Sequence, residues 1–284
     1  MIRTATRSDL PRIIALFANA NDAPYDLAAV AAEKCFGAGV SGEPNVAVFD
    51  DFAGVAVTCG KSLRILAVDR KQRGRGIGSA LHRDAVSRGV RIVAAEAGNY
   101  FTPGVVTTDT PTIDFFTKRG YRETANTYNL VAELGVGSGE WGVENQTPPP
   151  TPHTPLPIRV VPQTRDPLLS FIEKEFGRIW RFEASNAGDN LFYVEVDGKI
   201  AGFAAHDANN RGLGFFGPTG VARAHRGRGL GAALLRASLA DLRRLGYERA
   251  IIPWTDALDF YRKACGATVA ARFVTLARDV DSAP

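Results

Sequence analysis

The sequence predicts an α+β fold that occurs twice along the chain, each copy a mixed, mostly antiparallel sheet flanked by helices. The stretch RGRGIG at 73–78 recurs as RGRGLG at 226–231, and the same order of strand and helix patterns surrounds both copies. A segment rich in glycine and proline, 135–157, separates the copies and has the composition of a linker. We therefore expect an N-terminal domain at 1–134, this linker, and a C-terminal domain at 158–284.

The elements of the first half follow from apolar periodicity and helix signals. Ser8 and Asp9 are good N-cap residues for a first helix. Alternating apolar residues predict the strands, and the loop at 73–78 connects a strand to an amphipathic helix. The expected elements are strands at 2–5, 45–50, 53–58, 62–68 and 91–97, helices from residue 8, at 77–89 and at 113–121, and a closing pair of short strands.

The second half repeats this order. Asp197-Gly198 between two apolar runs is a strong signal for a β-hairpin. Thr164 and Asp166 predict a helix start. The expected elements are strands at 158–161, 191–196, 199–205, 213–221 and 249–254, helices from 164–166, at 230–246 and at 258–267, and again a closing pair of short strands.

The bulk composition is that of an ordinary globular protein. The 284 residues are 45% hydrophobic and 23% charged, with a net charge of +4 and a pI near 9.0. No clustered basic stripe with interleaved aromatic residues is present, so the basic balance favours a small anionic ligand over nucleic acid. Three cysteines without C-x-x-C spacing argue against a disulfide framework and a metal site, and no apolar run is long enough to span a membrane. We expect a cytoplasmic protein.

The repeated loop has the chemistry of a phosphate cradle. Residues 68–81 and 221–234 share nine identities in 14 positions, covering a strand end, the glycine turn and the first helical turn. Free N–H groups at a helix N-terminus, close backbone approach at glycine and arginine donors together bind phosphate or pyrophosphate. The third glycine falls one place early for a Rossmann fingerprint, and the G-K-[ST] of a P-loop is absent. The alternative is a basic turn without ligand, which the duplication disfavours.

These motifs resemble the GNAT superfamily of N-acetyltransferases. The pattern R-x-x-G-x-G after a strand that ends in valine resembles the acetyl-CoA-binding motif of that family. A second resemblance is the helix of IDFFTKRGY (113–121) and LDFYRKACGA (258–267). The resemblance implies tandem GNAT-like domains with acetyl-CoA as cofactor, bound by Val68, Arg73, Gly74, Arg75, Gly76, Ile77 and Gly78 in the first half and by Val221, Arg226, Gly227, Arg228, Gly229, Leu230 and Gly231 in the second.

The resemblance also implies roles in the chemistry. The backbone N–H near Val68 or Val221 polarises the acetyl carbonyl, and a tyrosine protonates the departing thiolate. The second half has Tyr261 at that position, whereas the first has Phe116, so we expect the chemistry in the C-terminal half. Tyr121, Tyr128 or water could replace the acid in the first half. Tyr261 could instead be an aromatic residue packed in the core.

The general base is open, because exposed carboxylates are mostly solvated surface. An alkylammonium ion is only about 0.1% neutral at pH 7, so a base is expected to help. We select Glu195 and Asp207 as catalytic candidates with Tyr261. The other candidates are Glu183, His206 and Asp256 in the second half and Glu96 and Asp109 in the first, and His225 is expected beside the pyrophosphate instead.

Two further segments are candidates for the acceptor side. NYFTPGVVTTDTPT at 99–112 is unusually long for a strand-to-helix connection, and shapes either an acceptor pocket or the contact between the halves. Trp180, Phe182 and Trp254 either line a second pocket or pack in the core.

The expected function is transfer of an acetyl group from acetyl-CoA to a primary amine. The acceptor classes are amino sugars, aminoglycosides, polyamines, amino acids and peptides. The alternatives are an acetyl-CoA-binding sensor or scaffold without turnover, and a nucleic-acid module using the R-G-R-G loops. We expect no nucleic-acid or membrane partner, and either a monomer with pseudo-dimeric halves or a homodimer.

Overall fold

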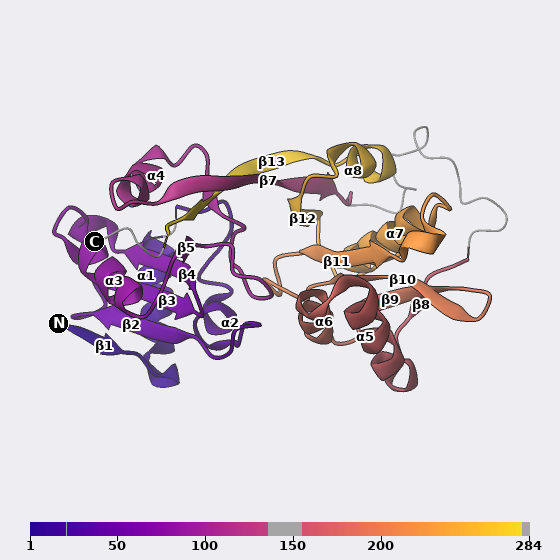
Figure 1. Cartoon of the computed structure of the whole chain (residues 1–284), viewed down its shortest axis with the longest axis horizontal. Helices are drawn as coiled ribbons and strands as arrows, with labels where there is room; N and C mark the ends of the chain where they lie inside the picture. The colour runs from indigo at the N-terminus through magenta and orange to yellow at the C-terminus, as the bar shows by residue number, and fades with distance from the viewer. Residues whose placement is uncertain (21, 136–154, 280–284) are drawn as a thin grey trace. The chain divides into compact units, whose positions relative to one another are not determined.

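The computed structural model describes residues 1–20, 22–135 and 155–279 (Figure 1), so most of the predicted linker lies outside the described residues. The chain forms two compact units. Unit 1 is Met1–Thr127 together with the chain from Ala271, and unit 2 is Tyr128–Ala270. These units differ from the expected contiguous domains, because Tyr128–Leu134 belongs to unit 2 and the C-terminal residues belong to unit 1.

Unit 1 is a mixed sheet flanked by helices. Its strand order is β1-β2-β3-β4-β5-β13-β7, with β6 also pairing with β13. All these pairs whose register is known are antiparallel except β4 with β5, which is parallel. The elements in chain order are β1 (Ile2–Thr4), η1 (Arg7–Asp9), α1 (Leu10–Ala20), α2 (Ala31–Phe36), β2 (Asn45–Phe49), β3 (Gly54–Cys59), β4 (Ser62–Val68), η2 (Arg70–Gln72), α3 (Ile77–Ser87), β5 (Ile92–Val93), β6 (Val105–Val106), α4 (Thr110–Thr117), β7 (Arg122–Glu133) and β13 (Thr268–Ala277).

The sequence pattern explains most of these elements. Helix α1 buries Ile13, Leu16, Phe17 and Ala20, which recur at the spacing of one helix face. Strand β5 is much shorter than the expected 91–97. Its backbone turns into the left-handed region directly after Val93, so the apolar residues that follow leave the sheet.

Unit 2 repeats the arrangement. Its four-stranded antiparallel sheet has the order β11-β10-β9-β8, and β12 pairs with the C-terminal half of β7. The Asp197-Gly198 turn has positive φ at both residues, as the hairpin prediction requires. The elements are β8 (Ile158–Arg159), α5 (Pro162–Phe176), α6 (Arg178–Ser185), β9 (Leu191–Val196), β10 (Lys199–His206), β11 (Phe216–Val221), η3 (Arg223–His225), α7 (Leu230–Arg244), β12 (Arg249–Thr255) and α8 (Leu258–Cys265).

The closing strands differ from the expectation of two short strands per half. Each half ends in one long strand, and that strand contributes to both units. Leu130 of β7 is buried in the core of unit 2, whereas Val274 and Leu276 of β13 are buried in the core of unit 1. The two halves of the sequence therefore exchange their last strands. Each unit is completed by residues from the other half.

Candidate functional site

The arginine-glycine loop has the same backbone geometry in both units. Gly74 and Gly76 have φ of 77° and 81°, and Gly227 and Gly229 have φ of 76° and 77°. Glycine reaches this left-handed region without the strain that other residues would incur. No side chain caps the helix that follows in either unit, so its first N–H groups can meet an anion. The predicted anion-binding geometry is present twice.

A β-bulge opens a gap beside the loop in unit 1. Strands β4 and β5 pair only through Ser62 and Leu63 of β4. The ladder between β3 and β4 then skips Arg64, which is the extra residue of a bulge. Beyond Arg64, β4 continues to Val68 without β5 at its side. The gap between these two strands therefore begins at the bulge.

The edge of β4 presents backbone N–H groups to this gap. Val68 lies opposite Gly54, and the N–H of Asp69 donates to the carbonyl of Ala53. This pattern makes Val68 part of a non-hydrogen-bonded pair, so its N–H points away from β3. Val221 has the same arrangement in unit 2. Both N–H groups expected to polarise an acyl carbonyl lie on the outer edge of their strand.

A cavity of about 620 Å³ occupies the gap in unit 1. It is lined by β4 from Leu63 to Val68, by the loop with the first turn of α3, and by Phe115 and Phe116 of α4. Much of its remaining wall comes from the 99–112 segment, including Phe101 and Thr102. The cavity therefore joins the anion-binding loop to the open edge of β4.

The first arginine of each loop forms a hydrogen bond to the end of the preceding strand. The Nε atoms of Arg73 and Arg226 donate to the carbonyls of Val68 and Val221, each at 3.2 Å. Arg73 also pairs with Asp22 at 2.6 Å. These arginines therefore fasten the loop to the strand end. Their neighbours in the loop extend outward: Arg75 and Arg228 are exposed.

In unit 2, aromatic rings cover the strand position that matches part of this cavity. Gly220 aligns with Ala67, which lines the unit 1 cavity. A Cβ atom on Gly220 would lie 2.6 Å from the ring of Phe176 and 3.0 Å from that of Trp180. The two rings stack at 5.2 Å and pack against Phe203 in the core. Trp180 is thus partly buried and packs against the core of unit 2, and these rings cover β11 at Gly220, the position that aligns with Ala67 of the unit 1 cavity.

Tyr261 and Phe116 occupy equivalent places on α8 and α4. Tyr261 is buried and packs against Phe216 and Phe260, with ring centroids 6.3 and 4.9 Å away. Burial, and then the neighbouring Cys265, raise the pKa of the Tyr261 phenol, so it stays protonated at neutral pH. The proton that a general acid needs is therefore present in unit 2, and Phe116 provides none in unit 1.

Glu195 and Asp207 lie apart. Glu195 on β9 faces Ile200 near the hairpin turn, whereas Asp207 follows the far end of β10. Seven residues of strand separate these ends, a distance of about 20 Å. Asp207 is buried and accepts a hydrogen bond from the hydroxyl of Tyr247 at 2.7 Å. The two carboxylates therefore cannot serve one acceptor amine together.

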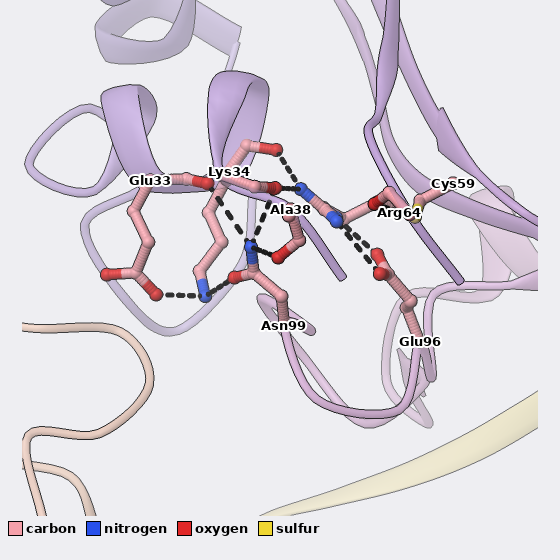
Figure 2. Close-up of polar contacts among 9 residues, drawn as sticks. Glu33, Lys34, Ala38, Cys59, Arg64, Glu96 and Asn99 are labelled. Carbon is pink, nitrogen blue, oxygen red and sulfur yellow. Dashed lines mark hydrogen bonds and ion pairs between the residues drawn. The ribbon is translucent and has the colours of Figure 1, made fainter. Parts of the chain in front are cut away.

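Glu96 is held in a buried network in unit 1 (Figure 2). Its carboxylate receives two hydrogen bonds from the guanidinium of Arg64, and Arg64 also donates to the carbonyls of Lys34 and Gly37 at 2.7 and 2.9 Å. Lys34 donates to Asn99 at 2.8 Å, and burial lowers its pKa to about 8. Both oxygens of the Glu96 carboxylate are thus engaged by the guanidinium of Arg64. The network instead fixes the bulge to α2 and the segment after β5.

The remaining base candidates have structural partners or lie on the surface. Asp109 caps α4 by accepting from the N–H of Thr112 at 3.1 Å, and it lines the cavity. His206 is fully buried, 2.9 Å from Asp241. Asp256 is exposed and Glu183 is buried. Of these carboxylates, Asp109 is the one at the cavity.

Three residues near the cleft were missed in the sequence. They are Arg64, Arg119 and Phe176, and the first two stand out only when the halves are compared position by position. Arg64 aligns with Gly217 in the second half, and Arg119 aligns with Ala264. Such differences between otherwise matching strands and helices are the signal that could have found the first two. No comparable signal marks Phe176.

The comparisons agree with this architecture. The sequence model of the acetyltransferase (GNAT) family matches residues 161–267. A glucosamine N-acetyltransferase region of a fungal multi-domain β-N-acetylglucosaminidase has a TM-score of 0.75 at 18% identity; it covers 97% of this chain, which spans 38% of that protein. A GNAT acetyltransferase from Sphaerobacter thermophilus gives 0.67 at 22%, covering 97% and 94% of the two chains. A tandem GNAT protein from the clavulanic acid biosynthesis pathway gives 0.69 at 16%, covering 100% and 99%.

Curated protein sequences provide no match. The fold and the anion-binding loop geometry occur in both units, and the solved structures share this fold over nearly the whole chain. Residues 161–267 belong to the GNAT family of acetyltransferases, which confirms the resemblance drawn from the loops. Within the residues that the structure describes, no helix is long and apolar enough to cross a membrane, and no cluster of three or more potential metal ligands occurs.

Proposed function

We propose that the protein is an acetyl-CoA-dependent N-acetyltransferase acting on a primary amine of a small molecule, with the cofactor bound in the cavity of unit 1. The observation that supports this most is the cavity of about 620 Å³ that runs from the arginine-glycine loop to the open edge of β4. Its size is typical of a small-molecule site. This placement departs from the expectation that chemistry resides in the C-terminal half.

The residues of unit 1 suit the parts of such a site. The loop and the first turn of α3 would hold the pyrophosphate, and the N–H of Val68 would polarise the acyl carbonyl. Acetyl-CoA supplies the thioester. Asp109 is the carboxylate we propose as the base, since it lines the cavity and only one of its oxygens caps α4. Phe116 cannot donate a proton, so the thiolate, with a pKa of about 8.5, would take one from water.

A second candidate places the chemistry in unit 2. Tyr261 is retained there, and the family match covers this half. Acetyl-CoA would then bind at the loop at 226–231, where the rings of Phe176 and Trp180 over Gly220 limit the space on one face of β11. A third candidate, acetyl-CoA binding without turnover, is favoured by Phe116. We keep the cytoplasm as the proposed compartment.

A matched pair of charge reversals in the full-length protein separates the first two candidates. Arg75→Glu and Arg228→Glu change equivalent exposed residues of the two loops. Titration calorimetry with acetyl-CoA should show at least about tenfold weaker binding for Arg75→Glu, the cost of a lost charge-assisted contact, and less than about twofold change for Arg228→Glu. The opposite result would move the site to unit 2.

Turnover is tested by thiol release over a panel of amines. Amino sugars come first in the panel, because one structural relative is described as a glucosamine N-acetyltransferase region. Asp109→Asn keeps a good N-cap but removes the base, so we expect an unchanged acetyl-CoA affinity and a kcat lower by about 10² or more. Tyr261→Phe should leave kcat unchanged. Binding without turnover of any amine would favour the sensor.

A further inference from the structure

Arg119, directly after α4, is held rigidly at the wall of the unit 1 cavity. Its guanidinium carbon lies 3.6 Å from the centroid of the Phe115 ring. One terminal nitrogen donates to the Ser79 hydroxyl at 2.6 Å, and the other donates to the carbonyl of Phe115 at 2.6 Å. Ser79 belongs to the first turn of α3. These contacts place a cation beside the helix N-terminus that closes the loop.

The charge of this guanidinium is not balanced locally. Arg119 is half-buried, and among the residues that the structure describes it forms no ion pair with a carboxylate. Burial lowers its pKa, and the neighbouring Arg83 lowers it further. A half-buried cation next to a second cation is unfavourable on its own. An anion bound at this wall would remove that cost.

The feature occurs at the unit 1 cavity and not at the aligned positions of unit 2. Phe115 and Phe260 are equivalent, because a Cβ atom on Gly78 would lie 3.7 Å from the ring of Phe115 and one on Gly231 would lie 3.6 Å from that of Phe260. The two residues that complete the arrangement differ: Ser79 aligns with Ala232 and Arg119 with Ala264. The rings are thus common to both units, whereas the cation and the hydroxyl that orients it occur only beside the open cleft.

We propose that Arg119 binds a phosphate group of coenzyme A at the wall of the unit 1 cavity and thereby restricts tight cofactor binding to unit 1. The inference rests on the proposed function, since it names a ligand of the same site. The recognising chemistry is a planar guanidinium, oriented by Phe115 and Ser79, with its remaining donors free for phosphate oxygens. The phosphate is either the pyrophosphate or the 3′-phosphate of the cofactor.

The test compares three compounds on the full-length protein by titration calorimetry: coenzyme A, dephospho-coenzyme A and acetyl-pantetheine. Arg119→Met keeps the apolar stem and removes the charge. Coenzyme A should bind it at least about tenfold more weakly, while acetyl-pantetheine affinity stays within about twofold. Arg119→Lys should recover part of the loss. Arg83→Met removes an exposed charge nearby on α3 and should change coenzyme A affinity by less than about twofold.

The three compounds distinguish the two phosphates. If dephospho-coenzyme A also loses about tenfold, Arg119 binds the pyrophosphate; if it binds wild type and Arg119→Met equally, Arg119 binds the 3′-phosphate. Equal coenzyme A affinity of Arg119→Met and wild type would overturn the proposal. So would a parallel loss of acetyl-pantetheine, which would indicate a structural role. If the wild-type protein binds none of the three compounds, the proposed function is overturned as well. If Arg75→Glu weakens coenzyme A binding and Arg119→Met does not, this inference alone is overturned.

Discussion

The exchange of β13 makes the stability of unit 1 depend on the end of the chain. Removing residues 271–284 deletes three side chains with almost no exposed surface: Phe273, Val274 and Leu276, exposed by 0%, 1% and 0%. It also removes the pairing of β13 with β5 and β6. Unit 1 would lose its last strand although its own half of the sequence is intact.

The magnitude follows from burial. Burying a side chain of this size contributes about 1.5–3 kcal/mol, so the three together contribute about 5–9 kcal/mol. A domain is stable by only about 5–15 kcal/mol. We therefore expect the truncated chain to have an unfolded or barely stable unit 1. Hydrogen exchange followed by mass spectrometry reports on each unit separately, and amides of β3 and β4 should lose protection at 25 °C.

Two controls make this prediction specific. Leu276→Ala should destabilise unit 1 by about 2–5 kcal/mol, because it leaves a cavity in the core. Val269→Ala changes an exposed residue of the same strand and should cost less than about 0.5 kcal/mol. Protection of β3 and β4 that survives removal of residues 271–284 would refute the strand exchange. The same result would show that an isolated first half folds alone.

Three further outcomes are expected. Glu96→Gln leaves Arg64 buried without its counter-charge and should cost about 3–5 kcal/mol in urea unfolding, whereas replacing both residues by apolar ones should cost less. Burial and nearby arginines lower the pKa of His82 to about 4, so the folded state binds its proton less readily than the unfolded state. The free energy of unfolding should therefore fall by up to about 3 kcal/mol as the pH decreases from 6.5 towards 4. His82→Leu, which introduces the residue found at the aligned position 235 of unit 2, should reduce this loss of stability at low pH. Phe176→Ala should cost about 3–5 kcal/mol and raise the acetyl-CoA stoichiometry from one to two; a stoichiometry that stays at one would count against the ring as the obstacle.

The local elements could be predicted because their signals are local. The loops, the helices that follow them and the Asp197-Gly198 hairpin depend on glycine positions and on apolar spacing within about 15 residues. The duplication was readable for the same reason, since it repeats these local signals. The two N–H groups on the strand edges followed from the resemblance and the strand ends.

The strand exchange, the bulge and the filled gap depend on residues far apart in the sequence. Nothing in β7 or β13 distinguishes pairing within its own half from pairing with the other half, because both choices bury the same apolar pattern. The length of β5 was overestimated because apolar residues continue after Val93 while the backbone turns. Arg64 and Glu96 are 32 positions apart, and only the fold shows that they satisfy each other. Phe176 covers Gly220 from a helix whose pattern indicates only a buried face.

The two units show that the loop alone does not decide where the cofactor can bind. Both loops have the same backbone and the same strand-end N–H, and each holds its arginine against the strand in the same way. The difference lies at one aligned position of the strands: Ala67 lines the cavity of unit 1, whereas the ring of Phe176 covers Gly220 in unit 2. The ring of Phe176 lies where a Cβ atom on residue 220 would be 2.6 Å away, so this packing requires glycine at that position. The candidate general acid is distributed the other way: unit 2 has Tyr261 at this position, whereas unit 1 has Phe116. Unit 1 therefore has a cavity but no acid, whereas unit 2 keeps the acid and has aromatic rings over the matching strand position. We give the cavity precedence in placing the cofactor, since a missing acid slows the reaction whereas a site without room prevents binding.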